Sequence, residues 1–101
     1  MIKVGLLAQF EIKPGKKAEV ETFLKEALTI VNSEKETVTW YAVQLSPSIF
    51  GIFDTFQDEE GRELHLSGKV AEALMEKSTD LFISSPSIQK IEILASKISG
   101  K

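Results

Sequence analysis

The chain has one histidine, His65, and it lies between a strand-like run and a helix-like run in the stretch "GIFDTFQDEEGRELHLSGKVAEALM", residues 51–75. Histidine is the only side chain whose ordinary pKa lies close to neutral pH, so His65 is the residue best suited to take up a proton and return it. Asp54 precedes it in the same stretch and is a candidate to orient the imidazole ring if the fold brings the two together. Proton-transfer chemistry is therefore the first chemistry to consider.

The sequence leaves two interpretations of His65 open. On one continuous helix it would lie on a polar arc with Arg62, Lys69 and Glu72, where an imidazole is solvated and has no task. If the helix breaks at Ser67-Gly68, the first segment is free to turn its own face inward and to carry His65 into a pocket. Glycine costs roughly 1 kcal/mol against alanine inside a helix, so its presence beside His65 favours a break.

Other polar residues give weaker signals. Glu34 and Glu36 are interpreted as solvated loop charge. Ser84 and Ser85 fall in a loop, and a chain without a second histidine has no general base left for a serine nucleophile. The sequence has no cysteine, no metal-ligand spacing and no glycine-rich phosphate loop, so we expect neither a metal nor a bound cofactor.

The elements that must position these residues follow from the spacing of apolar side chains. Alternation over residues 3–12 predicts a strand, and apolar residues three and four apart over 17–31 predict an amphipathic helix. Residues rich in β-branched and aromatic types predict further strands. The remaining expectations are strands at 37–45, 49–56 and 88–96, and a helical stretch that begins after Asp58 and is split at Ser67-Gly68.

The resulting order, β-α-β-β-α-β, predicts an α+β fold of the ferredoxin-like kind, an antiparallel sheet with helices on one face. The strands carry apolar or aromatic residues on both sides, such as Trp40 beside Tyr41. A sheet face left bare with such residues would be a large apolar patch, which usually marks an interface. We therefore expect a homodimer packed sheet to sheet.

Length and composition set the outer limits. The 101 residues predict a single domain over 1–101, and a net charge of -3 without any basic run argues against nucleic acid as a partner. No stretch approaches the roughly 20 apolar residues of a membrane span, and the first residues do not resemble a signal peptide. The expectation is a cytoplasmic protein with no membrane partner.

Three stretches together resemble the antibiotic biosynthesis monooxygenase domain: "KPGK" after the first strand, "TWYAVQLSPSIFGIFDTFQDEEGRELHLSGKVAEALM", and "SSPSIQKIEIL". The likeness covers nearly the whole chain, and its most recognisable part is a strand of the type F-x-x-F-D-x-F followed by an acidic helix start and a His-Leu pair. The resemblance implies a ferredoxin-like unit that dimerises through its sheets into a dimeric α+β barrel.

The family resemblance also implies an activity. Some members are oxygenases without a cofactor, in which a deprotonated aromatic substrate passes an electron directly to dioxygen. Others degrade haem, but here Gln9, His65 and Met75 stand where that branch would carry its asparagine, tryptophan and iron-ligating histidine. The resemblance thus points to a cofactor-independent monooxygenase acting on a small phenolic, quinol-like or polycyclic aromatic compound.

In that interpretation His65 is the catalytic residue. The expected substrate-binding residues are Gln9, Trp40, Tyr41, Phe53, Asp54 and Phe56. The alternative, from another class of function, is a non-catalytic dimer of the same fold that binds a small apolar ligand or serves as an accessory protein. Trp40 and Phe53 also fit ordinary core or interface positions.

Overall fold

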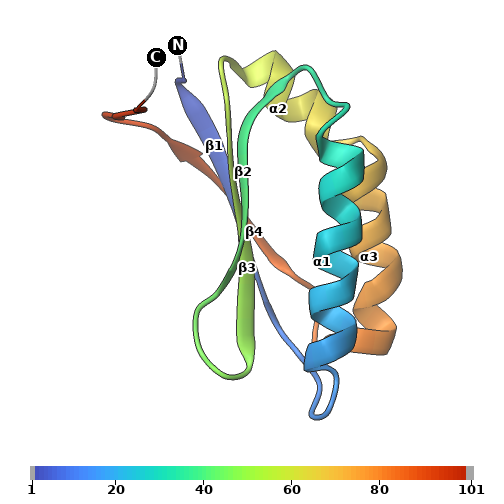
Figure 1. Ribbon diagram of the computed structural model, residues 1–101. Coiled ribbons are helices and arrows are strands. Elements are labelled where there is room, and N and C mark those ends of the chain that lie inside the picture. The colour runs from blue at the N-terminus through green and yellow to red at the C-terminus, as the bar shows by residue number, and fades with distance from the viewer. Residues whose placement is uncertain (1, 100–101) are drawn as a thin grey trace.

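The structure is a computed structural model that describes residues 2–99, and within them one antiparallel sheet of four strands is covered on one face by three helices (Figure 1). The strand order is β2-β3-β1-β4, which confirms the predicted ferredoxin-like α+β plan. In chain order the elements are β1 (Val4–Glu11), α1 (Lys17–Val31), β2 (Thr37–Gln44), β3 (Ile49–Phe56), α2 (Glu59–Leu66), α3 (Lys69–Leu81) and β4 (Ser87–Glu92).

The sheet has two unlike faces, because successive side chains of a strand point to opposite sides. The inner face, toward the helices, carries Leu6, Ala8 and Phe10 of β1, all buried. The outer face carries the residues between them, and there Leu7 of β1 pairs with Phe53 of β3. Strand parity therefore decides on which side of the sheet each candidate site residue lies.

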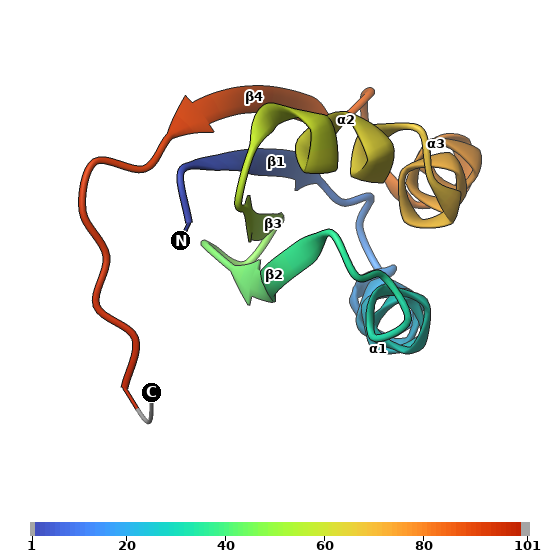
Figure 2. The same ribbon diagram turned by 90° about the horizontal axis from the view of Figure 1, so that it is seen from above.

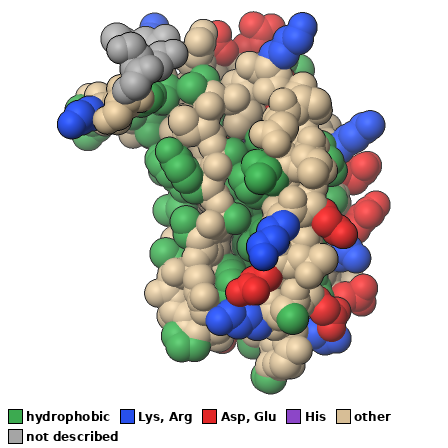
Figure 3. All heavy atoms as spheres, in the orientation of Figure 1, with side chains coloured by type: hydrophobic (Ala, Val, Ile, Leu, Met, Phe, Trp, Pro, Cys, Tyr) green, Lys and Arg blue, Asp and Glu red, His purple; other side chains and the backbone are tan. Residues whose placement is uncertain are grey.

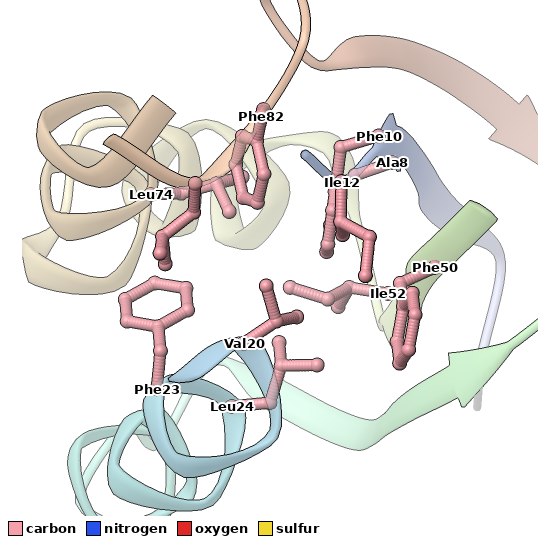
Figure 4. Close-up of a cluster of buried hydrophobic side chains, with 11 residues drawn as sticks. Ala8, Phe10, Ile12, Val20, Phe23, Leu24, Phe50, Ile52, Leu74 and Phe82 are labelled. Atoms are coloured by element: carbon pink, nitrogen blue, oxygen red, sulfur yellow. The ribbon is translucent and has the colours of Figure 1, made fainter. Parts of the chain in front are cut away.

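The core lies between the inner face and the helices. α1 contributes Val20, Phe23 and Leu24 from its apolar stripe, and these side chains meet those of β1, β3 and α3 (Figure 4). Phe10 and Phe82 stack there with ring centroids 4.4 Å apart. Burial of such a stripe is the main force that keeps an amphipathic helix in place on a sheet.

The helical stretch after Asp58 breaks as the sequence predicts. The Asp58 side chain accepts a hydrogen bond from the Gly61 amide at 2.9 Å and so caps α2. α2 ends at Leu66, and Ser67 and Gly68 form the corner. Gly68, in an extended conformation, is the N-cap residue of α3. The break sets the two helices at different angles to the sheet, so each turns its own face toward it (Figure 2).

The last strand is shorter than the sequence predicts. β4 pairs with β1 only from Ser87 to Glu92, whereas a strand was expected over 88–96. Beyond Ile93, whose amide bonds to the Lys3 carbonyl at 3.0 Å, residues 94–99 run without a partner strand and are all exposed. We call residues 93–99 the C-terminal arm. It leaves the body on the side of the sheet away from α1 and α3 (Figure 2).

The surface shows how the two layers differ. In the view of Figure 3, charged side chains gather over the helices on the right, and hydrophobic side chains show in the middle and on the left, where the sheet lies. None of the helices within residues 2–99 is both long enough and apolar enough to cross a membrane.

Candidate functional site

His65 lies inside the protein. It sits in the last turn of α2 and only 5% of its surface is exposed, because α2 ends one residue later and turns this face toward the sheet. The ring packs against Phe56 of β3 with centroids 5.3 Å apart. Of the two interpretations that the sequence left open, the inward-facing one therefore describes the structure.

Both ring nitrogens of His65 contact carboxylates. Nδ1 lies 2.7 Å from Oε1 of Glu34, and Nε2 lies 3.0 Å from Oδ2 of Asp54. Thr37 donates its hydroxyl to the same Glu34 oxygen at 2.7 Å and lies 3.4 Å from Nδ1. We call the imidazole and its two carboxylate partners the Glu34–His65–Asp54 cluster; Thr37 lies beside it.

Three separate elements bring the cluster together. Asp54 is an inner-face residue in the middle of β3, placed between Leu6 of β1 and Trp40 of β2. Glu34 lies in the turn after α1, where its amide bonds to the Val31 carbonyl at 2.8 Å. The cluster forms only when the helix turn, the sheet and α2 have all docked, so it is a product of tertiary structure.

The pKa values of both His65 and Asp54 are raised, so both groups hold a proton more tightly than they do in water. Burial by itself would lower the pKa of His65, but hydrogen bonds and negative charge from Asp54 and Glu34 outweigh burial, so the pKa is raised above its ordinary value. Burial raises the pKa of Asp54, and the hydrogen bond and charge of His65 offset this only in part. Both shifts therefore favour the protonated form, for Asp54 because of burial and for His65 because of its two carboxylate neighbours.

Asp54 borders a small apolar cavity. The cavity of about 30 Å³ lies between the sheet and the corner of α2 and α3, and His65 also lines it. Its other walls are apolar side chains, among them Leu66, Val70 and Ile88. Oδ1 of Asp54 is buried and has no hydrogen-bond partner within the described part of the chain. The arrangement is thus a desolvated carboxyl oxygen, backed by an imidazole, at the edge of an apolar space.

The cavity has room for little more than a water molecule as it stands. An aromatic molecule would enter only if its walls moved. Leu66 and Val70 flank the Ser67-Gly68 corner, and Ile88 of β4, which is 42% exposed, also lines the cavity.

The sheet separates the residues that the sequence assigned to one pocket. Trp40, Asp54 and Phe56 lie on the inner face with His65. Gln9, Tyr41 and Phe53 lie on the outer face; Tyr41 and Phe53 stack there with ring centroids 6.3 Å apart. Within one chain these six side chains do not wall a common pocket, because neighbours on a strand point to opposite sides.

Trp40 borders a different hollow. A groove of about 490 Å³ runs between α1 and the edge strand β2, and Leu24, Leu28, Trp40 and Phe50 form its apolar floor. The indole nitrogen of Trp40 is buried and has no hydrogen-bond partner among residues 2–99. This groove is wider than the cavity at Asp54, but it lacks a cluster of titratable groups like the one at His65.

Two charged residues of the site region, Glu34 and Arg62, have no role in the site that the sequence predicts. Glu34 was expected to be solvated loop charge, and that expectation is wrong: its side chain is 11% exposed and bonded to His65. Arg62 is 3% exposed, and its Nη1 donates to the backbone oxygens of Gly5 and Ile91. Arg62 and His65 lie three positions apart, so they share a helix face. Once His65 is placed inside the protein, this spacing predicts that Arg62 is buried with it.

The part of the chain that the structure describes holds no group of three or more histidine, cysteine, aspartate or glutamate side chains arranged to bind a metal ion. Comparison of the sequence with protein-family models and with curated proteins gives no match.

Solved structures are similar over nearly the whole chain. Two proteins titled putative antibiotic biosynthesis monooxygenase share the fold: one from Caulobacter crescentus CB15 (TM-score 0.79, 12% identity, 93% of this chain and 92% of that one) and one from Nitrosomonas europaea (TM-score 0.80, 10% identity, 91% and 90%). The fold is therefore that of the antibiotic biosynthesis monooxygenase domain, as the sequence resemblance predicts.

A third structure is much more similar in sequence. The NE2512 protein of Nitrosomonas europaea, whose function is unknown, is 44% identical over 100% of this chain and 98% of its own length, with a TM-score of 0.94. This chain belongs to the same family as NE2512.

Proposed function

We propose that this protein is a cofactor-independent monooxygenase that acts on a small phenolic, quinol-like or polycyclic aromatic compound. The observation that supports this most directly is the buried Oδ1 of Asp54, which has no hydrogen-bond partner among residues 2–99 and belongs to a residue beside His65 and an apolar cavity. A carboxylate in such a place accepts a phenolic proton more readily than one in water, because burial raises its pKa toward that of the phenol.

In this mechanism Asp54 accepts the proton and His65 donates a hydrogen bond. The O–H bond of the phenol breaks, the proton forms an O–H bond on Asp54, and the resulting phenolate transfers electrons to dioxygen. One phenol and one O₂ then give one quinone and one water, so the substrate itself supplies all the electrons. His65 is a poor general base here, because both of its ring nitrogens already face carboxylates.

Oxygen consumption with a panel of hydroquinones, naphthols and anthrones tests this function. We expect the wild-type protein to consume oxygen with at least one compound, and Asp54→Asn to lower kcat about a hundredfold or more, as loss of a general base does. Asp80→Asn, the same change on an exposed face of α3, is the matched control and should leave the rate unchanged. Full turnover in Asp54→Asn, or no turnover by the wild type with any compound, would contradict the proposal.

The groove between α1 and β2 supports a second candidate, the binding of a small apolar ligand without turnover. Trp40 is the only tryptophan in the chain and lines this groove, so its fluorescence reports occupancy directly. Saturable quenching of Trp40 without oxygen consumption would favour this candidate. Turnover that leaves Trp40 fluorescence unchanged would favour the cavity at Asp54 as the working site.

The assembly that we propose is a homodimer packed through the outer face. Leu7, Tyr41 and Phe53 form an apolar row across that face, and Tyr41 is 54% exposed. The C-terminal arm leaves the body on the same side, and its Leu94 is 95% exposed. A second copy related by a two-fold axis would cover both the row and the arm in each chain, because a two-fold contact uses the same patch twice.

A further inference from the structure

Glu34 is the one member of the cluster to which the mechanism so far gives no task. It approaches His65 from the turn after α1, opposite to Asp54, and its Oε1 makes the shortest contact of the ring at 2.7 Å. The groups that face the imidazole are Asp54 and Phe56 from β3, Thr37 from β2 and Glu34 itself. Of these only Asp54 and Glu34 carry charge.

The donors and acceptors around the ring constrain its protonation. When both carboxylates are ionised, they accept hydrogen bonds and donate none, so each of the two contacts needs a proton on the ring nitrogen. The Thr37 hydroxyl donates a hydrogen bond to the same oxygen of Glu34. With a proton on both nitrogens, His65 is an imidazolium cation, and Glu34 and Asp54 are its two counter-ions.

We propose that Glu34 is a positioning residue that keeps His65 a cation in the buried site. This inference rests on the proposed function in one respect, the step in which Asp54 takes a proton from the substrate. At that step the substrate O–H bond breaks, an O–H bond forms on Asp54, and the negative charge passes to the substrate oxygen. Asp54 no longer neutralises His65, but Glu34 still does, so a fixed cation remains beside the new anion.

The protonation state of His65 tests the inference without any substrate. We expect ¹⁵N NMR of the whole protein to show a proton on both ring nitrogens at pH 7. Glu34→Gln keeps an oxygen that accepts from Nδ1 but removes the charge, so the midpoint of the His65 titration should fall by about one pH unit, a tenfold loss of proton affinity. Glu36→Gln, the same change two residues along the turn, is the matched control and should titrate like the wild type.

A wild-type ring with one bare nitrogen at pH 7, or a Glu34→Gln midpoint within a few tenths of the wild-type value, would overturn the inference. Thermal unfolding of each variant shows whether it is folded at the pH of the measurement. If Glu34→Gln does not fold, the wild-type ¹⁵N spectrum still decides, because it asks directly whether both nitrogens carry protons.

A binding measurement separates this result from the proposed function. 4-Nitrophenol changes its visible absorption when it ionises, so titration of the protein shows both binding and the state of the phenol. We expect the wild type to bind the phenolate. Glu34→Gln should bind it equally well below both His65 midpoints and progressively more weakly as pH rises through them, with the difference reaching about tenfold above both. Failure of the wild type to bind would count against the proposed function alone, since the NMR result decides the part of Glu34.

Discussion

Stability of the fold alone does not explain why two carboxylates contact His65. Charged groups inside a protein lose hydration, and apolar residues of the same size often stabilise a fold as well as a buried ion pair does. The Glu34–His65–Asp54 cluster nevertheless lies beside a cavity, and one of its carboxyl oxygens has no hydrogen-bond partner in the described part of the chain. Titratable groups with shifted pKa values beside a cavity are typical of functional sites, and this supports looking for chemistry at Asp54.

The same residue predicts how the free energy of unfolding depends on pH. The folded-state pKa of His65 is raised, so its stabilising contribution is complete below the ordinary pKa and is lost as pH rises through the folded value. The raised pKa of Asp54 acts in the same direction at lower pH, because the folded state holds that proton more tightly. Urea denaturation from pH 5 to pH 9 should therefore show the unfolding free energy falling with pH.

His65→Gln is the comparison for that experiment. It removes the titrating group, so the fall above neutral pH should disappear, and at pH 6 the variant should be less stable by about 3 kcal/mol because two buried carboxylates lose their cation. A variant that keeps the wild-type pH dependence would show that the slope comes from other groups.

At the scale of elements, β1 and β3 lie so close together at Gly51 that no side chain larger than hydrogen fits there. A Cβ atom added at Gly51 of β3 would lie 2.8 Å from the backbone oxygen of Ala8 in β1, on the outer face. Real Cβ atoms do not come so close to a backbone oxygen, so β1 and β3 would have to separate.

Gly51→Ala should consequently lower the free energy of unfolding by about 2 kcal/mol, within the range of overpacked cores. Denaturant unfolding measures this. Gly15→Ala is the contrasting variant: Gly15 has φ of 80° and open space around it, so only backbone strain of about 1 kcal/mol is expected there. A Gly51→Ala protein as stable as the wild type would mean that the strands tolerate a wider spacing.

Much of this architecture can be predicted from local sequence. The spacing of apolar residues, together with the turn residues, predicted β1, α1, β2 and β3 to within a residue or two. Ser67-Gly68 predicted the corner between α2 and α3. The end of β4 was not predictable in this way: the sequence favours a strand as far as Ser96, but β4 pairs with β1 only as far as Glu92.

The candidate site was predictable only in part. Period two already implies that Trp40 and Tyr41, being adjacent, point to opposite faces of the sheet, so the division of the six predicted residues between the two faces of one chain follows from the sequence. Glu34 could not have been found in the same way. Its contact with His65 joins residues 31 positions apart through the docking of a turn against a helix, and no local pattern encodes that distance.

At the scale of the whole molecule, the outer face is the surface through which we propose that two copies associate. Light scattering during gel filtration should give a dimer for the wild type, and Phe53→Lys should give a monomer because a charge would then lie in the middle of the apolar row. Leu64→Lys makes the same change at a residue of α2 that is 55% exposed on the helix side, and it should stay dimeric. A monomeric wild type at micromolar concentration would exclude the proposed assembly.

The C-terminal arm also bears on how long the chain survives in the presence of proteases. Exposed segments without hydrogen-bonded partners are the places where proteases cut first, and Lys97 presents a trypsin site in the middle of such a segment. If a second copy covers the arm, cleavage after Lys97 proceeds only from the dissociated chains. The rate of that one cut then falls as protein concentration rises, and dilution alone would shorten the lifetime of the intact arm.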